Sequence, residues 1–294
     1  MHRLDLFSTI CCALLTISAT SVVAQDKAPA TQEKTTPAQN KTAAPEKPAA
    51  AQEKPAGLNV TAEQVAESSI LAYGSRVVLN QIRRNGLEHG KVTRTTPEGR
   101  IEEATYDRRF IRGDNATKDK VRLDEKMPTL EYSLIYGDGR LWGIINGTAF
   151  TPKQETASSF LTHYWHTIDA LLRYKENEST ISLVGKDKQK GIDLYVLDLE
   201  DKEKRKTRYY ISAHTLHVLW LEYEESPLPG SSAVKYTRKF FDYRIAQSTI
   251  VPYRTVLLAN DKQIEETRIL SVTYGLRLED SIFQNPDVQA NSNP

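Results

Sequence analysis

The sequence predicts an α+β protein that is mainly β, with one curved antiparallel sheet and helices packed against one face. From Leu87 onward, apolar residues recur with a period of two in short segments that turn residues separate. Only two segments carry the helical period. Because the connections between extended segments are short, the expected strands, about ten or eleven, form an antiparallel meander. Such a sheet must bend or close to protect its edges.

The N-terminal segment, residues 1–24, has the features of a secretory signal peptide. A basic start precedes a short apolar run, and the residues before position 25 favour cleavage after Ala24. A retained membrane anchor is the alternative interpretation. Cys11 and Cys12 both lie in this segment, in a context unlike that of a lipid-attachment site. The exported chain would therefore contain no thiol and no disulfide.

Two further segments are expected to be disordered. Residues 25–57 are rich in Lys, Pro, Ala and Gln and, within 26–57, contain no aromatic residue and no Val, Ile or Leu. This composition cannot bury enough apolar surface to offset chain entropy, so it predicts a loosely extended linker. It is either a plain spacer or a tether. Residues 287–294 are predicted to be a disordered tail, which leaves one folded domain at 58–286.

The first helix is expected from Ala62 to Arg84. Thr61 is a suitable N-cap residue, and Gln64 stands where a capping box requires it. Its apolar face is expected to comprise Val65, Ile70 or Leu71, and Val78 or Ile82. Gly74 is a position at which this helix could break.

The extended segments that follow carry clear turn signals. Leu130, Tyr132, Leu134 and Tyr136 share one face of a predicted strand because they alternate with polar or smaller residues. The glycine-rich sequence at 137–139 and the dipeptide Asn146-Gly147 then predict tight turns.

A second helix is predicted from Lys153 to Tyr174, midway through the meander. Its apolar stripe is broad and aromatic, so this helix is expected to pack on one face of the curved sheet. Strands resume after it, and the last two are expected to pair around a turn at Asn260-Asp261.

Sequence motifs for catalysis are weak. His163 and His166 are three residues apart on the second helix, but only Asp169 offers a nearby third ligand, so we expect no metal site. No serine lies in a G-x-S-x-G motif, and the glycines around Asp138 lack the context of a phosphate loop. The formal net charge of +1 argues against nucleic acid as a partner. The sequence therefore predicts a non-enzymatic protein without a cofactor.

The C-terminal region contains an aromatic-Asp-Tyr-Arg strand, a Pro-Tyr strand and a closing D-S-I-F-x-x-P sequence. These motifs, together with the first helix, resemble those of bacterial outer-membrane lipoprotein-sorting proteins, the LolA-like carriers. The resemblance covers about Leu58 to Pro286 and marks a fold more than an activity. The matching residues are Phe241, Asp242, Tyr243, Arg244, Pro252, Tyr253, Arg254, Asp280, Ser281, Phe283 and Pro286.

This resemblance implies an unclosed, strongly curved antiparallel β half-barrel with helices on its concave face and a hydrophobic cavity between them. It implies a monomeric periplasmic carrier or sensor that binds a lipid or an acylated lipoprotein and has envelope proteins as further partners. A regulatory or scaffold domain with a packed interior is the alternative, and an envelope hydrolase is the third. We expect the lid and walls of the cavity to comprise Leu130, Tyr132, Leu134, Trp142, Phe160, Tyr164, Trp165, Ile168, Leu172, Leu194, Val196, Leu219, Leu221 and Tyr223.

Overall fold

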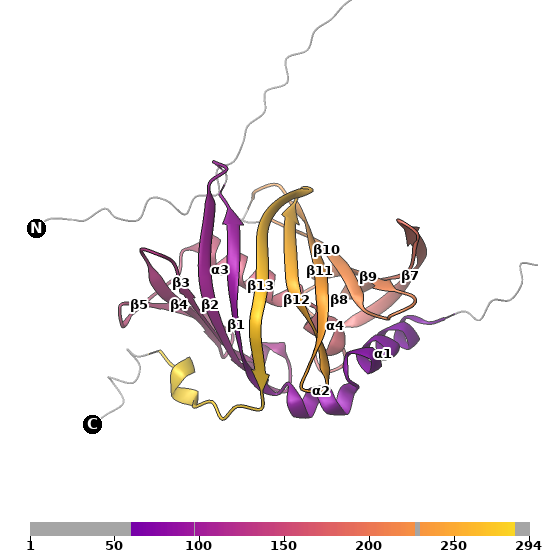
Figure 1. The fold of residues 1–294 in the computed structure, drawn as a ribbon, viewed down its shortest axis with the longest axis horizontal. Coiled ribbons are helices and arrows are strands. Elements are labelled where there is room, and N and C mark those ends of the chain that lie inside the picture. Colours follow the sequence, from indigo (N-terminus) through magenta and orange to yellow (C-terminus); the bar gives the residue numbers. More distant parts are fainter. Residues whose placement is uncertain (1–59, 97, 227–229, 286–294) are drawn as a thin grey trace, which may run out of the picture. The chain divides into compact units, whose positions relative to one another are not determined.

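Thirteen strands form a single antiparallel sheet in the described part of the chain (Figure 1). The computed structural model describes residues 60–96, 98–226 and 230–285. The predicted signal peptide, linker and tail, at residues 1–24, 25–57 and 287–294, lie outside them. The strands are β1 (Asn85–Thr95), β2 (Ile101–Ile111), β3 (Lys120–Lys126), β4 (Glu131–Gly137), β5 (Arg140–Ile145), β6 (Thr148–Phe150), β7 (Thr180–Gln189), β8 (Ile192–Glu200), β9 (Lys206–Ser212), β10 (Val218–Glu225), β11 (Val234–Ala246), β12 (Thr249–Ala259) and β13 (Lys262–Tyr274).

The chain runs from the middle of the sheet to one edge, crosses to the other edge and returns. The strand order is β6-β5-β4-β3-β2-β1-β13-β12-β11-β10-β9-β8-β7, so the first and last strands are neighbours. The crossing between the two edges is made by α3 (Gln154–Trp165) and α4 (Ile168–Leu172). The antiparallel meander with a helical interruption midway is therefore confirmed, and the sheet is not closed.

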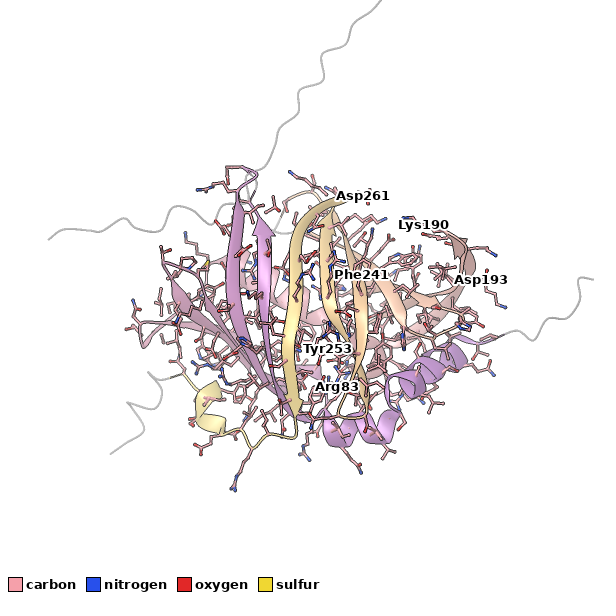
Figure 2. The ribbon with its side chains drawn as sticks, in the orientation of Figure 1. Arg83, Lys190, Asp193, Phe241, Tyr253 and Asp261 are labelled. Atoms are coloured by element: carbon pink, nitrogen blue, oxygen red, sulfur yellow. The ribbon has the colours of Figure 1, made fainter. Side chains whose placement is uncertain are left out.

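Two-residue turns join several of these strands. Asn260 and Asp261 both have positive φ, 46° and 65°, as a type I′ turn between twisted strands requires. Asp138-Gly139 and Asn146-Gly147 have the same pattern. The three predicted turns are thus confirmed. Figure 2 shows Asp261 at the tip of the β12–β13 hairpin and Arg83 near the other end of these strands.

The first helical segment forms two helices, α1 (Ala62–Tyr73) and α2 (Arg76–Ile82). Thr61 and Gln64 make the predicted capping box at the start of α1. Gly74 ends α1 with φ of 135°, and Ser75 then caps α2. The predicted break at Gly74 is confirmed.

The prediction of one continuous helix from Lys153 to Tyr174 was wrong. The chain leaves the helical conformation at His166 and Thr167 and re-enters it at Ile168. Thr167 is extended, with φ of −135°, and its hydroxyl accepts the backbone N–H of Ala170. A local N-cap thus starts a second helix, which the apolar periodicity alone did not reveal.

Two large apolar clusters fill the helix-covered face of the sheet. The first joins α1 and α4 to strands β8 to β11, with Tyr73, Leu171, Tyr209 and Leu221 among its fully buried members. The second joins strands β2, β3, β4, β11, β12 and β13, with α3 packed against it. Within the described residues no helix has the length and apolar character needed to span a membrane.

The sheet is strongly curved around α3. The ring of Trp165 lies 6.1 Å from that of Tyr136 on β4, and the guanidinium of Arg205, just before β9, lies 4.3 Å from the Trp165 ring centroid. β4 and β9 are eight steps apart in the strand order, which is about 38 Å on a flat sheet. One side chain can touch both only if the sheet bends, so α3 lies on the concave face.

Candidate binding site

The junction between α3 and α4 is anchored to the sheet by His166. The His166 side chain is 1% exposed, its Nδ1 lies 2.7 Å from Thr207 Oγ1, and its Nε2 lies 3.2 Å from Glu225 Oε1. Burial lowers the pKa of His166, so its ring is neutral at pH 7. We assign the tautomer in which Nε2 donates to Glu225 and Nδ1 accepts from the Thr207 hydroxyl.

Arg238 on β11 holds the C-terminal end of α3. Its Nη1 donates to the carbonyl oxygens of His163 and His166, at 3.1 Å and 3.0 Å. These carbonyls are among those that a helix leaves without an intrahelical partner at its end. The guanidinium also places a positive charge at the negative end of the helix dipole. Arg238 therefore ties α3 to the concave face through backbone groups alone.

The two helices differ in how tightly they are packed. The residues of α3 are at most partly buried, and Phe160, Leu161, Tyr164 and Trp165 contact the second apolar cluster. In α4, by contrast, three of five residues are buried, with Leu171 fully so. Much of the apolar surface of α3 still contacts water. The hydrophobic free energy that holds α3 to the sheet is therefore smaller than full burial of its apolar side chains would give.

The concave floor next to α3 contains an ion-pair cluster. Arg94 donates two hydrogen bonds to Glu125, at 2.7 Å and 2.8 Å, and a third of 2.9 Å to Glu265. Tyr132 donates to the same Glu125 carboxylate at 2.8 Å. Burial acts to raise the pKa of Glu265, but Arg94 lowers it overall, so both partners are charged. The interior is thus not uniformly apolar.

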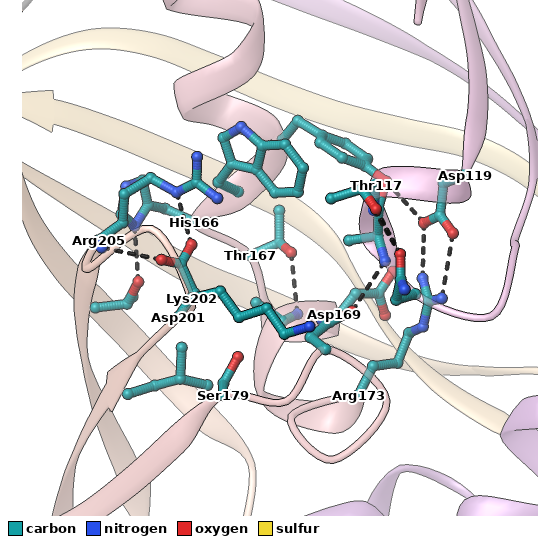
Figure 3. Close-up of a pocket in the computed structure, with 18 of the residues that line it drawn as sticks. Thr117, Asp119, His166, Thr167, Asp169, Arg173, Ser179, Asp201, Lys202 and Arg205 are labelled. Atoms are coloured by element: carbon teal, nitrogen blue, oxygen red, sulfur yellow. Dashed lines mark hydrogen bonds and ion pairs between the residues drawn. The ribbon is translucent and has the colours of Figure 1, made fainter. Parts of the chain in front are cut away.

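A pocket of about 110 Å³ lies at the α3–α4 junction (Figure 3). We call it the junction pocket. Phe110, Val121, Tyr164, Trp165 and Leu199 give it an apolar side. Its volume is well below the ~300 Å³ of the smallest typical ligand pockets.

Charged side chains form the rest of the junction pocket. Figure 3 shows Arg173 paired with Asp119 on one side and Arg205 paired with Asp201 on the other, with Asp169 between them. Arg173 Nη1 lies 2.7 Å from Asp119 Oδ2, and both side chains are nearly buried. Within the described residues, no group of three or more His, Cys, Asp or Glu is arranged to hold a metal ion.

The structure brings most of the predicted cavity residues to the concave face. Those on the helices fall in both apolar clusters, and those on β4 and β10 share the face that α3 and α4 cover, as strand alternation from their neighbours shows. Of these, Ile168, Leu172, Leu221 and Tyr223 are buried members of the first cluster. The concave-face residues are Tyr132, Leu134, Phe160, Tyr164, Trp165, Ile168, Leu172, Leu221 and Tyr223.

The remaining predicted residues are not gathered with them. Leu194 and Val196 alternate with Leu197, a member of the concave-face cluster, and so lie on the opposite face of β8. Trp142 pairs with Ile135, which places it on the opposite face from Leu134. Leu219 falls at a β-bulge in β10, and Leu130 precedes β4.

Sequence reasoning missed the charged part of the site. Arg173 and Asp119 are far apart in sequence, and each stands in an ordinary polar context. Arg238 likewise follows a strand pattern, with no signal that its side chain reaches a helix end. The usable signal was the alternation itself, since it puts Arg238 on the same strand face as Tyr236 and Phe240, both of which contact the first apolar cluster.

Comparison of the sequence with family models and with curated proteins finds no match. Solved structures do match the fold. A DUF1329 family protein from Desulfovibrio piger has a TM-score of 0.55 at 12% identity, covering 78% of this chain and 99% of that one. A LolA superfamily protein from Nitrosomonas europaea has a TM-score of 0.53 at 10% identity, covering 76% and 98%.

A domain from Vibrio parahaemolyticus, assigned to outer membrane lipoprotein sorting, has a TM-score of 0.53 at 11% identity, and the alignment covers 76% of this chain and 96% of that one. At these identities the likeness concerns the arrangement of the backbone. In this chain that arrangement is an unclosed antiparallel sheet curved around α3. The chain has the unclosed β half-barrel fold of the LolA superfamily.

Proposed function

We propose that this protein is a non-enzymatic carrier or sensor of the bacterial envelope that binds a lipid, or the acyl chain of a lipoprotein, between α3 and the concave sheet. The observation that carries the proposal is the partial burial of α3 above an aromatic cluster. A helix held in this way can exchange its contacts with the sheet for those of an apolar ligand. Each buried CH₂ of an acyl chain contributes about 0.8 kcal/mol toward that exchange.

The aromatic cluster supports the position of the ligand. Tyr136, Tyr164 and Trp165 lie with ring centroids 4.8 to 6.1 Å apart. Displacement of α3 would remove two of these rings and leave Tyr136 and Phe110 on the sheet as the new lining. Arg238 is the latch in this scheme, because it holds the carbonyls at the end of α3.

A regulatory or scaffold domain is the second candidate. The small volume of the junction pocket favours it, as do the ion pairs of Arg94 with Glu125 and Glu265. An acyl chain placed against these charged groups would take them out of water without giving them a polar partner, which costs free energy. In this case α3 would stay in place and the outer surface would bind partner proteins.

Native mass spectrometry of the purified full-length chain tests the proposal, together with solvent extraction of bound lipid. We expect an acyl-containing species at about one per chain, and uptake of a fluorescent fatty acid from vesicles. Arg238→Met should speed that uptake about 10-fold, because it removes the charge-assisted bonds to α3. Arg208→Met is the matched control, since Arg208 pairs with Asp198 through a side chain that is 44% exposed.

Absence of bound lipid and of uptake in the wild-type chain and in Arg238→Met would overturn the carrier proposal and favour the second candidate. Equal acceleration by Arg208→Met would show that loss of any arginine loosens the protein, and the latch assignment would then be wrong.

A further inference from the structure

The arginines around Asp169 outnumber the carboxylates that could neutralise them. Arg112 Nη2 donates to Asp169 Oδ2, and Arg83 Nη2 lies 3.4 Å from Asp169 Oδ1 without a hydrogen bond. One carboxylate therefore serves two guanidinium groups, whose side chains are only 11% and 10% exposed. The Nε atom of Arg83 is buried and has no hydrogen-bond partner within the described residues.

The neighbouring charges do not restore the balance. Arg108 also lines the junction pocket and is paired with Glu88, while Arg173 is occupied by Asp119. Lys202 reaches the pocket from the β8–β9 connection and is paired with Glu178. These three pairs are one to one, whereas Arg205 on the other side of the pocket has two carboxylates, Asp201 and Glu203. The positive surplus is therefore confined to the two guanidinium groups that share Asp169.

The electrostatic state of the cluster agrees with this arrangement. Burial acts to raise the pKa of Asp169, yet the surrounding arginines, Arg112 and Arg83 foremost, lower it well below its usual range. Burial and the nearby Arg83, against the attraction of Asp169, lower the pKa of Arg112. An additional anion in contact with Arg112 would therefore stabilise its charged guanidinium.

We propose that the junction pocket binds a phosphate-like oxyanion, held by Arg112 and Lys202 beside Asp169. A phosphate group carries about −1.5 to −2 charge at pH 7 and presents three acceptor oxygens to guanidinium donors. The pocket, with a volume of about 110 Å³, has room for such a group and is small for a whole lipid. Phe110 and Trp165 line the same pocket, so its apolar side is continuous with the aromatic cluster under α3.

The oxyanion is either free phosphate or the head of an amphiphile whose apolar part lies under α3; the second form rests on the function proposed above. The carboxylates Asp119, Asp169, Asp201 and Glu203 also line the pocket and repel an anion that does not contact a cation directly. The proposal therefore predicts that only an anionic group in direct contact with Arg112 and Lys202 gains affinity. A neutral head would gain nothing there.

Calorimetry on the full-length chain with three probes tests the inference. The probes are inorganic phosphate, a short-chain phosphatidic acid, and the diacylglycerol with the same chains. Two bonds to charged donors are expected to make the phosphatidic acid bind at least 10-fold tighter than the diacylglycerol. Arg112→Gln and Lys202→Gln should each reduce that ratio several-fold and leave diacylglycerol binding unchanged.

Arg100→Gln is the matched control, because Arg100 lies on the β1–β2 hairpin with a side chain 61% exposed. Thermal unfolding confirms that each variant is folded, and Lys202→Gln, at an exposed position, keeps the test valid if Arg112→Gln does not fold.

Binding of both lipids with equal affinity would overturn the oxyanion proposal and leave the carrier function standing. Binding of phosphate without either lipid would support the pocket and overturn the carrier. An unchanged ratio of phosphatidic acid to diacylglycerol affinity in both pocket variants would overturn the oxyanion proposal. Failure of all three probes to bind would overturn it as well.

Discussion

The imidazole of His166 stacks on the phenol ring of Tyr223, with ring centroids 4.0 Å apart and planes inclined by 3°. His166 ends α3, and Tyr223 lies on β10 in the concave floor. The stack fixes the point where the loosely packed α3 meets the buried α4. Movement of α3 alone is therefore possible about a joint that remains attached to the sheet.

Replacement of His166 by Ala should destabilise the protein by about 2–4 kcal/mol, since it removes the stack and leaves Thr207 and Glu225 without their partner. The midpoint of urea unfolding checks this. His214→Ala, at an exposed position in the β9–β10 turn, is the control and should change stability by less than about 0.5 kcal/mol. Equal midpoints for the two variants would contradict the anchoring role of His166.

Truncation of a side chain should cost less stability in α3 than in α4. Leu171→Ala removes a fully buried side chain and should cost about 2–5 kcal/mol. Trp165→Ala removes a larger but half-buried side chain from α3 and should cost less than that. Hydrogen exchange of residues 154–165 should rise in Trp165→Ala without faster exchange in β10. A cost for Trp165→Ala above that of Leu171→Ala would mean that α3 is integral to the core.

Breaking the concave ion-pair cluster should be costly. Arg94→Met leaves Glu125, whose side chain is 3% exposed, with a buried charge and only Tyr132 as a hydrogen-bond partner. The expected loss is about 3–5 kcal/mol in unfolding free energy, and the double variant Arg94→Met/Glu125→Met should recover much of it. Urea unfolding of the single and double variants measures both. Additive losses would show that the two side chains do not depend on each other.

Local rules predicted much of this fold, because turns and alternation are properties of neighbouring residues. Asn260-Asp261 marks a hairpin wherever it stands between two strands. The pairing of β1 with β13 is different: it joins the two ends of the folded domain, and no local pattern contains it. The sequence pattern could not show on which face of β8 Leu194 lies. β8 buries residues on both faces, so alternation does not distinguish the concave face from the opposite one.

The site was less predictable than the fold for a related reason. The apolar stripe of α3 is visible in the sequence, and it led to Trp165 and Tyr164. The charges of the junction pocket come from three separate segments, and Arg112 and Asp169 meet only after the sheet has curved. Sequence spacing carries no information about such a meeting.

Replacement of Gly90 should destabilise the protein, because neighbouring atoms leave no room for a side chain there. A Cβ atom at Gly90 would lie 2.6 Å from both the ring of Tyr106 and the carbonyl oxygen of Arg268. Gly90→Ala should therefore destabilise the protein by about 1–3 kcal/mol. Gly99→Ala in the neighbouring hairpin has open space around it but a φ of 83°, so its cost would come from backbone strain alone. The double variant Gly90→Ala/Tyr106→Leu should recover stability if the clash is with the ring.

The stability of the protein should depend on pH through His163. Burial lowers the pKa of His163 from 6.5 to about 4, with Arg238 and Arg94 opposing the charged form and Glu265 and Glu125 favouring it. A depressed folded-state pKa means that the unfolded chain takes up the proton first. The stabilising contribution is therefore complete above pH 6.5 and is lost as the pH falls toward 4. The full shift corresponds to at most about 3 kcal/mol.

Unfolding free energies of the wild-type chain and His163→Gln, measured from pH 7 to pH 4.5, separate this contribution. Burial also lowers the pKa of His166 and of His217, so both proteins should lose some stability over this range. The depressed pKa of Glu265 acts mainly below its usual value of 4.5, outside the window. The wild-type chain should lose more than the variant, by about 1–3 kcal/mol at pH 4.5. Parallel curves would show that His163 is as accessible to protons in the folded protein as in the unfolded chain, and α3 would then lie farther from the concave floor than the structure has it.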